Sequence, residues 1–179
     1  MPNFYLHDSR VTGETPRCDI PVLVHPTDDL RTKVEELARQ IERTYSEPAW
    51  NHTLHILCHG TSQGLQLGTS YATQTNVHLL FAPLHSKVGS VEIYGCSAAL
   101  SYNRGTPPVG PYDGEAFCRG LARTMESNVS ASDAVQGYLS SNSVTNNSRT
   151  IQMARWQGNV FTWNAHGQRS GVSTPAQRN

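Results

Sequence analysis

A histidine and a cysteine stand at the ends of two apolar segments of this chain. The first segment, Leu54–Gly60 (LHILCHG), carries His59 near its end, and the second, Val91–Ala98 (VEIYGCSA), carries Cys96. Both segments are rich in β-branched and apolar residues, which predicts buried strands. In an open α/β sheet, ligands bind where the carboxyl ends of the strands meet. An imidazole and a thiol brought together there supply a nucleophile and its base, so we take His59 and Cys96 as candidate catalytic residues.

Small residues beside these two side chains indicate room for a substrate. Gly60 follows His59, and Cys96 stands between Gly95 and Ser97. The backbone N–H groups of Gly60 and Cys96 could form an oxyanion hole at such turns, and Ser97 would line the substrate site. A structural role is the alternative for each residue taken alone, because free cysteines are usually buried core residues.

A carboxylate follows the next predicted strand along the chain. Asp133 comes directly after Asn128–Ser132, so it should reach the same edge of the sheet as Cys96. A carboxylate beside a thiol raises the thiol pKa and is a poor base for it. It is well suited to bind a substrate arginine or lysine through charge-assisted hydrogen bonds, with Ser132 beside it. A turn cap at Asp133 is the equally open alternative.

Two other kinds of site are weaker alternatives. Four side chains close in sequence have the chemistry of zinc ligands, namely His52, His55, Cys58 and His59. Strand pleating would divide them between two faces, so we expect no metal and no cofactor. The turn over residues 60–64 could hold a phosphate, but it matches neither the Walker nor the GxGxxG pattern.

Length and composition favour one globular domain. The chain has 179 residues, with 14 basic and 14 acidic side chains and no basic stripe, so we expect no nucleic-acid partner. No apolar run approaches the ~18 residues of a membrane span, and we expect no membrane association. The absence of a signal-peptide pattern and of a disulfide framework predicts a cytoplasmic protein. We expect one domain over 1–166 and a polar, disordered tail over 167–179.

Alternating strand and helix patterns predict an α/β fold, a mostly parallel sheet with helices on both faces. The clearest helix spans 28–46, with Thr27 as N-cap. A second, over 76–88, should split at Pro83, and a third, over 114–126, should be capped by Asp113.

The remaining predicted strands are short. They are Phe4–His7, Ile20–His25 and the arm Gly64–Gly68, with Arg149–Arg155 and Asn159–Trp163 paired as a C-terminal β-hairpin around Trp156–Gly158. Residues 101–114 and 136–148 have the composition of long loops.

The ordered set of motifs resembles the caspase-like (clan CD) cysteine peptidases, which include caspases, legumain, gingipains, separase and the bacterial CHAT proteases. It is more closely similar to a CHAT-related bacterial domain family of unknown function found in large surface adhesins. The similarity covers about residues 4–166 and is carried by Leu54–Gly60, Leu65–Gly68, Tyr94–Cys96, Gly114, Phe117, Leu121-Ala122, Val129–Asp133, Trp156-Gln157-Gly158 and Val160-Phe161.

This resemblance implies a caspase–hemoglobinase-like sheet with Cys96 as nucleophile and His59 as base or substrate-orienting residue. Asp133 matches the place of an aspartate that recognises basic P1 residues in separase-like and CHAT relatives. The chain departs from the caspase pattern because Gly95 precedes the cysteine and Ser97-Ala98-Ala99 follow it. A caspase preference for cleavage after aspartate is therefore not implied, and the more similar family has no established activity to transfer.

Together these observations predict a cysteine endopeptidase that cleaves protein or peptide substrates after arginine or lysine, with an activating partner among its expected contacts. Arg104-Gly105, in a predicted loop, is a candidate self-cleavage site. The alternative is a catalytically silent, caspase-like interaction module of a surface or effector protein, with the loops over 101–114 and 136–148 as its recognition rim. Thiol reactivity separates the two, because a catalytic cysteine is reactive and a structural one is inert.

Overall fold

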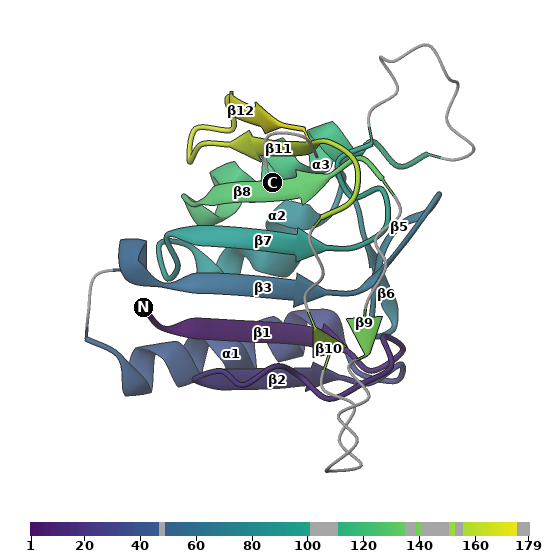
Figure 1. Ribbon diagram of the computed structural model, residues 1–179. Helices are drawn as coiled ribbons and strands as arrows, with labels where there is room; N and C mark the ends of the chain where they lie inside the picture. Colours follow the sequence, from purple (N-terminus) through teal and green to yellow (C-terminus); the bar gives the residue numbers. More distant parts are fainter. Residues whose placement is uncertain (47–48, 101–110, 135–138, 141–150, 153–155, 175–179) are drawn as a thin grey trace.

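The computed structural model describes residues 1–46, 49–100, 111–134, 139–140, 151–152 and 156–174 (Figure 1). The Arg104-Gly105 bond and most of the two expected loops lie outside these residues.

A seven-stranded sheet forms the centre of the molecule, in the order β12-β11-β8-β7-β3-β1-β2. The strands from β8 to β2 pair in parallel, whereas β11 is antiparallel to both β8 and β12. The bounds are β1 Asn3–Asp8, β2 Ile20–Val24, β3 Thr53–Leu57, β7 Ser90–Tyr94, β8 Asn128–Ser132, β11 Val160–Trp163 and β12 Arg169–Ser173. The predicted α/β class with a mostly parallel sheet is confirmed.

Two small antiparallel sheets accompany the large one. The first has the order β4-β5-β6, with β4 His59–Thr61, β5 Gly64–Leu67 and β6 Ser70–Ala72, and the second pairs β9 Leu139–Ser140 with β10 Ile151–Gln152. His59 thus begins β4 instead of ending β3.

The helices agree with the apolar patterns apart from one cap. They are α1 Leu30–Thr44, α2 Val77–Phe81 and α3 Gly114–Met125, with 3₁₀ turns η1 Ala49–Asn51 and η2 Ala82–Leu84. The change from α2 to η2 at Pro83 and the cap at Asp113, which accepts from the Ala116 N–H at 3.1 Å, are as predicted. The N-cap of α1 is Asp29, not Thr27, because its carboxylate accepts from the Thr32 N–H at 2.8 Å.

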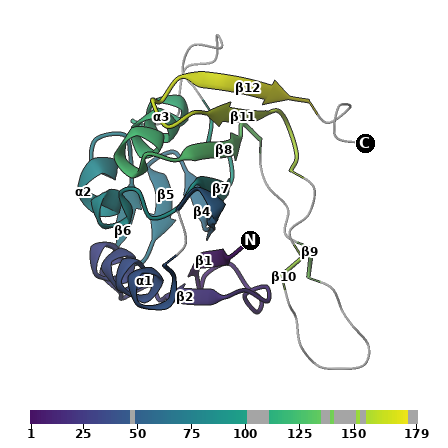
Figure 2. The same cartoon turned by 90° about the vertical axis from the view of Figure 1, so that its left-hand side faces the viewer.

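All three described α-helices cover the same face of the sheet, which corrects the expectation of helices on both faces (Figure 2). Right-handed crossovers that advance across a sheet in one direction all lie on one face. The steps from β2 to β3, from β3 to β7 and from β7 to β8 advance in that way and contain α1, α2 and α3. The step from β1 to β2 runs in the opposite direction, and its connection over residues 9–19 contains no helix.

The core lies between the helices and the sheet, and a smaller apolar cluster lies apart from it. That cluster consists of Tyr5, Val11 and Leu57, with Cys18 and Tyr94 packed against it. Val11 and Cys18 come from the β1–β2 connection, so this helix-free connection supplies part of the apolar cover of the sheet.

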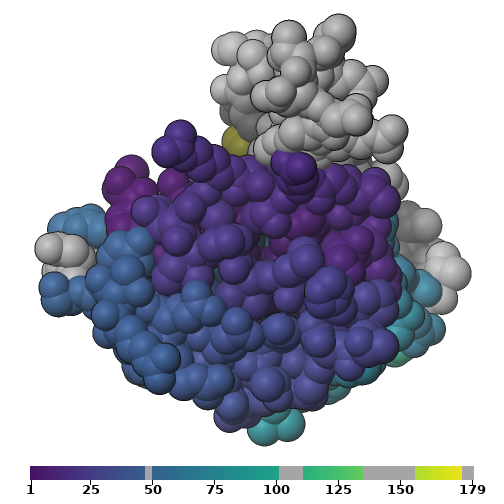
Figure 3. Space-filling view, turned by 90° about the horizontal axis from the view of Figure 1, so that it is seen from below, coloured from purple at the N-terminus to yellow at the C-terminus, as the bar shows by residue number. Residues whose placement is uncertain are grey.

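The two edges of the sheet differ. At the β2 edge, the surface is formed by amino-terminal residues next to α1 (Figure 3). Pro21 stands in this edge strand and has no N–H to offer to a further strand. At the other edge, β12 is the outermost strand of the sheet and pairs with β11.

The C-terminal hairpin is present, but its partner strand is different from the predicted one. β11 pairs with β12, so residues 169–173 belong to the sheet and not to a disordered tail that starts at 167. The turn between them is closed by Asn164, whose side-chain oxygen accepts from the N–H groups of His166 and Gln168, and by Gly167 at φ +71°. Within the predicted partner segment 149–155, the described residues 151–152 pair with β9 instead.

Candidate functional site

The candidate histidine and cysteine follow neighbouring parallel strands. The last registered pair of β3 and β7 is Leu57 with Tyr94, and the Cys58 N–H continues the ladder by donating to the Tyr94 carbonyl at 3.2 Å. His59 and Cys96 each stand two residues beyond that pair. The two residues therefore lie at one edge of the sheet, as their positions in the sequence indicate.

The backbones that carry the two residues touch. A Cβ atom built on Gly60 would lie 1.8 Å from the carbonyl oxygen of Cys96 and 3.1 Å from its nitrogen. Only glycine fits at position 60, because any side chain there would overlap the Cys96 backbone. The two N–H groups considered for an oxyanion hole, those of Gly60 and Cys96, come from these contacting segments.

The turn after Cys96 is fastened to the end of β8. Ser97 adopts φ 53°, a left-handed conformation that is uncommon for a residue with a side chain. Its N–H donates to the Ala134 carbonyl, and the Ala99 N–H donates to the Ser132 carbonyl, both at 2.9 Å. We call residues 96–99 the cysteine turn. It contacts β4 through Gly60 on one side and is hydrogen-bonded to the end of β8 on the other.

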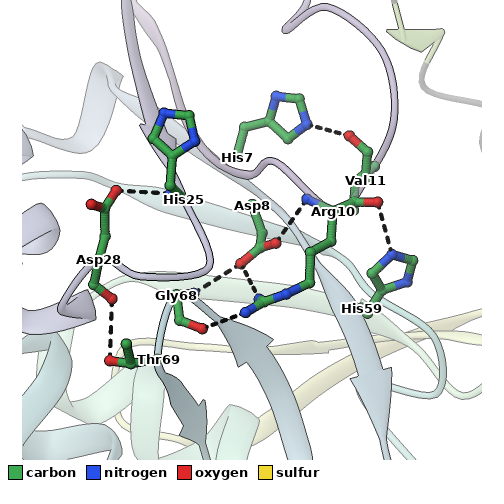
Figure 4. A network of polar contacts seen from close by, with 9 residues as sticks. All are labelled: His7, Asp8, Arg10, Val11, His25, Asp28, His59, Gly68 and Thr69. Atoms are coloured by element: carbon green, nitrogen blue, oxygen red, sulfur yellow. Dashed lines mark hydrogen bonds and ion pairs between the residues drawn. The ribbon is translucent and has the colours of Figure 1, made fainter.

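His59 is oriented by a backbone carbonyl from the β1–β2 connection. Its Nε2 lies 3.2 Å from the carbonyl oxygen of Arg10 (Figure 4). Because a carbonyl oxygen can only accept, Nε2 carries the proton in this bond, and Nδ1 is the ring atom left to accept one. The ring is half-buried, so the site is neither sealed in the core nor fully open to solvent.

This contact spans the topological switch point of the sheet. From β1 the chain moves to β2 in one direction, and from β3 it moves to β7 in the other. Connections that diverge in this way leave a crevice at the carboxyl ends of the strands, and ligands of open α/β sheets bind there. Arg10 follows β1 and His59 follows β3, so they stand on the two sides of that position.

A comparison with known protein families finds a match, and it covers the segment that contains His59 and Cys96. The model of a domain of unknown function, DUF4347, matches residues 30–144. The chain belongs to this family. No curated protein and no solved structure matches it.

The matched region of this DUF4347 domain contains His59, Cys96 and Asp133 but begins after β1. The residues that orient His59 from the end of β1 therefore precede the family match. None of the helices in the described ranges is long and apolar enough to cross a bilayer.

Asp133 lies at the expected edge and is engaged within the chain. Its Oδ1 accepts from the Asn159 N–H at 2.9 Å, and its Oδ2 lies 3.2 Å from the Asn159 side-chain amide nitrogen. The neighbouring Ser132 is buried, with its hydroxyl donating to the Gln157 carbonyl and accepting from the Ala134 N–H. Both side chains thus anchor the segment that leads into β11.

The four cysteines have different environments. Cys58 and Cys118 are buried, and burial raises the pKa of each thiol well above its usual range. Burial also raises the pKa of the half-buried Cys18. Cys96, in contrast to Cys58 and Cys118, is half-buried.

The candidate zinc ligands do not converge on one point, because their side chains have different neighbours. His59 is hydrogen-bonded to the Arg10 carbonyl. His52 packs against Phe4 and Tyr45, whereas His55 stacks on Tyr5 and lies 3.2 Å from Glu92. Cys58 is in the main core. No three His, Cys, Asp or Glu side chains converge within the described part of the chain.

Sequence reasoning missed Asp8 and Arg10. Asp8 ends β1 and is fully buried, and its carboxylate binds both Arg10 and the Gly68 N–H (Figure 4). A charged pair directly after a short apolar strand, in FYLHDSR, is the signal that was available. Nothing in the sequence shows that the partner is a glycine sixty residues away.

Proposed function

We propose that this domain is a cysteine endopeptidase of the caspase-like type, with Cys96 as nucleophile and His59 as base. The contact of Gly60 with the Cys96 backbone carries the proposal, because it seats the two residues on adjoining backbone segments. The orientation of His59 by the Arg10 carbonyl supports it, since a base needs one ring nitrogen held and the other left to accept a proton.

The reaction runs through an acyl-enzyme. His59 takes the proton of the Cys96 thiol, and the thiolate attacks the peptide carbonyl carbon. The N–H groups of Gly60 and Cys96 stabilise the negative oxygen of the tetrahedral intermediate. His59 then gives its proton to the departing amine as the C–N bond breaks. Water, deprotonated by the same imidazole, hydrolyses the thioester and restores the thiol.

Asp133 is proposed to bind the arginine or lysine on the amino side of the cleaved bond, with Ser97 beside it. The bonds from Ala99 and Ser97 to the end of β8 support this, because they bring the Asp133 segment next to the cysteine turn. A carboxylate there pairs with a basic side chain through charge-assisted hydrogen bonds.

The test is covalent labelling of the intact protein with an arginine- or lysine-containing acyloxymethyl ketone, with the adduct located by mass spectrometry. We expect one adduct on Cys96, absent in Cys96→Ala and slowed by about 100-fold in His59→Asn. Cys18 is the internal control, because it is also half-buried. If Cys96 reacts no faster than Cys18, the endopeptidase is wrong and the silent interaction module takes its place.

A further inference from the structure

An ion pair between a buried aspartate and a half-buried arginine lies next to the histidine of the candidate site. Asp8 is completely buried, and its Oδ2 accepts from Arg10 Nη1 and from the Gly68 N–H, both at 2.8 Å. Its Oδ1 accepts from the Arg10 N–H at 3.0 Å. A buried carboxylate is costly unless it is paired and hydrogen-bonded, and these three donors satisfy it. We call this the Asp8–Arg10–Gly68 network.

The network fixes the direction of the Arg10 carbonyl. The Arg10 N–H and guanidinium are both bound to Asp8, so the residue is held at two points. The next N–H, that of Val11, donates to the Asp8 carbonyl at 2.9 Å. In a planar trans peptide the C=O and N–H groups point in opposite directions. The Arg10 carbonyl is therefore aimed away from β1, where it accepts from His59 Nε2 (Figure 4).

The same network also holds the sheet that carries His59. Gly68 follows β5, and it both donates to Asp8 and accepts from Arg10 Nη2 at 2.7 Å. β5 pairs with β4, in which His59 stands opposite Gln66. One ion pair thus secures the acceptor of the His59 hydrogen bond and the element that brings the donor to it.

We infer that Asp8 is the positioning residue of the site, which sets the tautomer and direction of the His59 ring through Arg10. The inference rests on the proposed function, since it concerns the base of that reaction. Asp8 does not touch the reacting atoms, and it acts only through the peptide it holds. Without its carboxylate, the Arg10 N–H and guanidinium lose their acceptor, and only the Val11 N–H bond to the main-chain carbonyl of residue 8 still orients the Arg10 carbonyl. The Arg10 carbonyl is then held less firmly, and Nε2 and Nδ1 of His59 become alternative sites for the proton.

The experiment follows the ring nitrogens of His59 by NMR in ¹⁵N-labelled protein, with His59→Gln to assign the signals. In the parent at alkaline pH we expect a single tautomer with the proton on Nε2. In Asp8→Asn we expect mixed-tautomer signals, and a fall of about tenfold in the rate of Cys96 alkylation by iodoacetamide. Arg10→Gln, which leaves Asp8 its two backbone donors, should shift the signals in the same direction and keeps the test open if Asp8→Asn does not fold.

Asp28→Asn is the matched control. Asp28 lies at the same end of the sheet, and its carbonyl binds Thr69 of the same β5–β6 turn, but its carboxylate accepts from His25 and not from Arg10. It should leave the His59 signals unchanged. Folded Asp8→Asn and Arg10→Gln proteins with parental His59 signals would overturn the inference. Altered His59 signals together with a Cys96 no more reactive than Cys18 in the parent would support the positioning role and overturn the endopeptidase.

Discussion

Gly60 and Cys96 are joined by direct contact of their backbones, with no space for a side chain between them. Because His59 precedes Gly60, the separation of the imidazole and thiol segments is set by rigid peptide groups and not by flexible side chains. A site that needs its reacting groups held to within a fraction of an ångström benefits from such a contact.

Replacing Gly60 by alanine tests this contact. The added methyl group would stand 1.8 Å from the Cys96 carbonyl oxygen, so β4 or the cysteine turn must move. We expect Gly60→Ala to lower the free energy of unfolding by about 1–3 kcal/mol in urea denaturation and to abolish ketone labelling of Cys96. Gly171→Ala is the control, because its methyl group would lie 3.8 Å from Thr162 Cβ, an ordinary contact. Parental stability and labelling in Gly60→Ala would contradict the argument.

The double engagement of Asp133 with Asn159 gives a test of the basic-residue pocket. Asp133→Asn removes the charge, so labelling by an arginine-containing ketone should fall about tenfold while labelling by an alanine-containing one stays the same. Asn159→Ala keeps the carboxylate and removes one of its internal partners, the amide 3.2 Å away, so it should retain the preference for the arginine probe. Equal losses with both probes in Asp133→Asn would show that the carboxylate is only structural.

The elements that the sequence predicted well are those whose signals are local. The apolar stripe of α1, the cap at Asp113 and the split at Pro83 each depend on residues within one or two turns. The placement of His59 and Cys96 at one edge also follows locally, because each comes directly after an apolar strand.

The features that the sequence could not give depend on pairing between distant segments. The β1–β2 step runs opposite to the three steps that contain helices, and its connection over 9–19 has no helix, so the second face of the sheet receives none. The direction of that step depends on which strands pair, which is long-range information. The strand β11 pairs with both β8 and β12, whereas the apolar segment near 151, which the sequence predicted as its hairpin partner, pairs with β9. The Gly68 partner of Asp8 belongs to the same class of long-range information.

Glu92 provides a pH-dependent contribution to stability. The His55 ring, whose Nδ1 lies 3.2 Å from Glu92 Oε2, and then a hydrogen bond from the Tyr94 hydroxyl hold the pKa of Glu92 below the ordinary value of 4.5, against the opposite effect of burial. The ionised form therefore stabilises the fold fully above pH 4.5, and this contribution is lost as the pH falls through the lower, folded-state pKa.

We accordingly expect Glu92→Gln to cost about 1 kcal/mol at pH 7, a value discounted because the side chain is partly exposed. The difference from the parent should narrow as the pH falls below 4.5, which urea denaturation at several pH values measures. Glu35→Gln serves as the control, since its exposed pair with Arg31 on α1 should change stability by only a few tenths of a kcal/mol. A Glu92→Gln cost that does not change with pH would refute this account.

His7 should make the β1–β2 connection sensitive to acid. The ring is buried, and its Nε2 donates to the Val11 carbonyl while Nδ1 pairs with the Thr15 hydroxyl, both at 2.8 Å. Burial lowers its pKa from the ordinary value of 6.5, so the unfolded chain takes up a proton at higher pH than the folded one. The stability that neutral His7 supports is complete above pH 6.5 and is lost progressively as the pH falls below it.

Urea denaturation between pH 8 and pH 5 checks this, and we expect the parent to lose about 1 kcal/mol over that range. His7→Gln should be less stable than the parent at pH 8 but should have a flatter profile. His25→Gln, at an exposed histidine on the neighbouring strand end, should follow the parent throughout. Parallel profiles for His7→Gln and the parent would rule out His7 as the source.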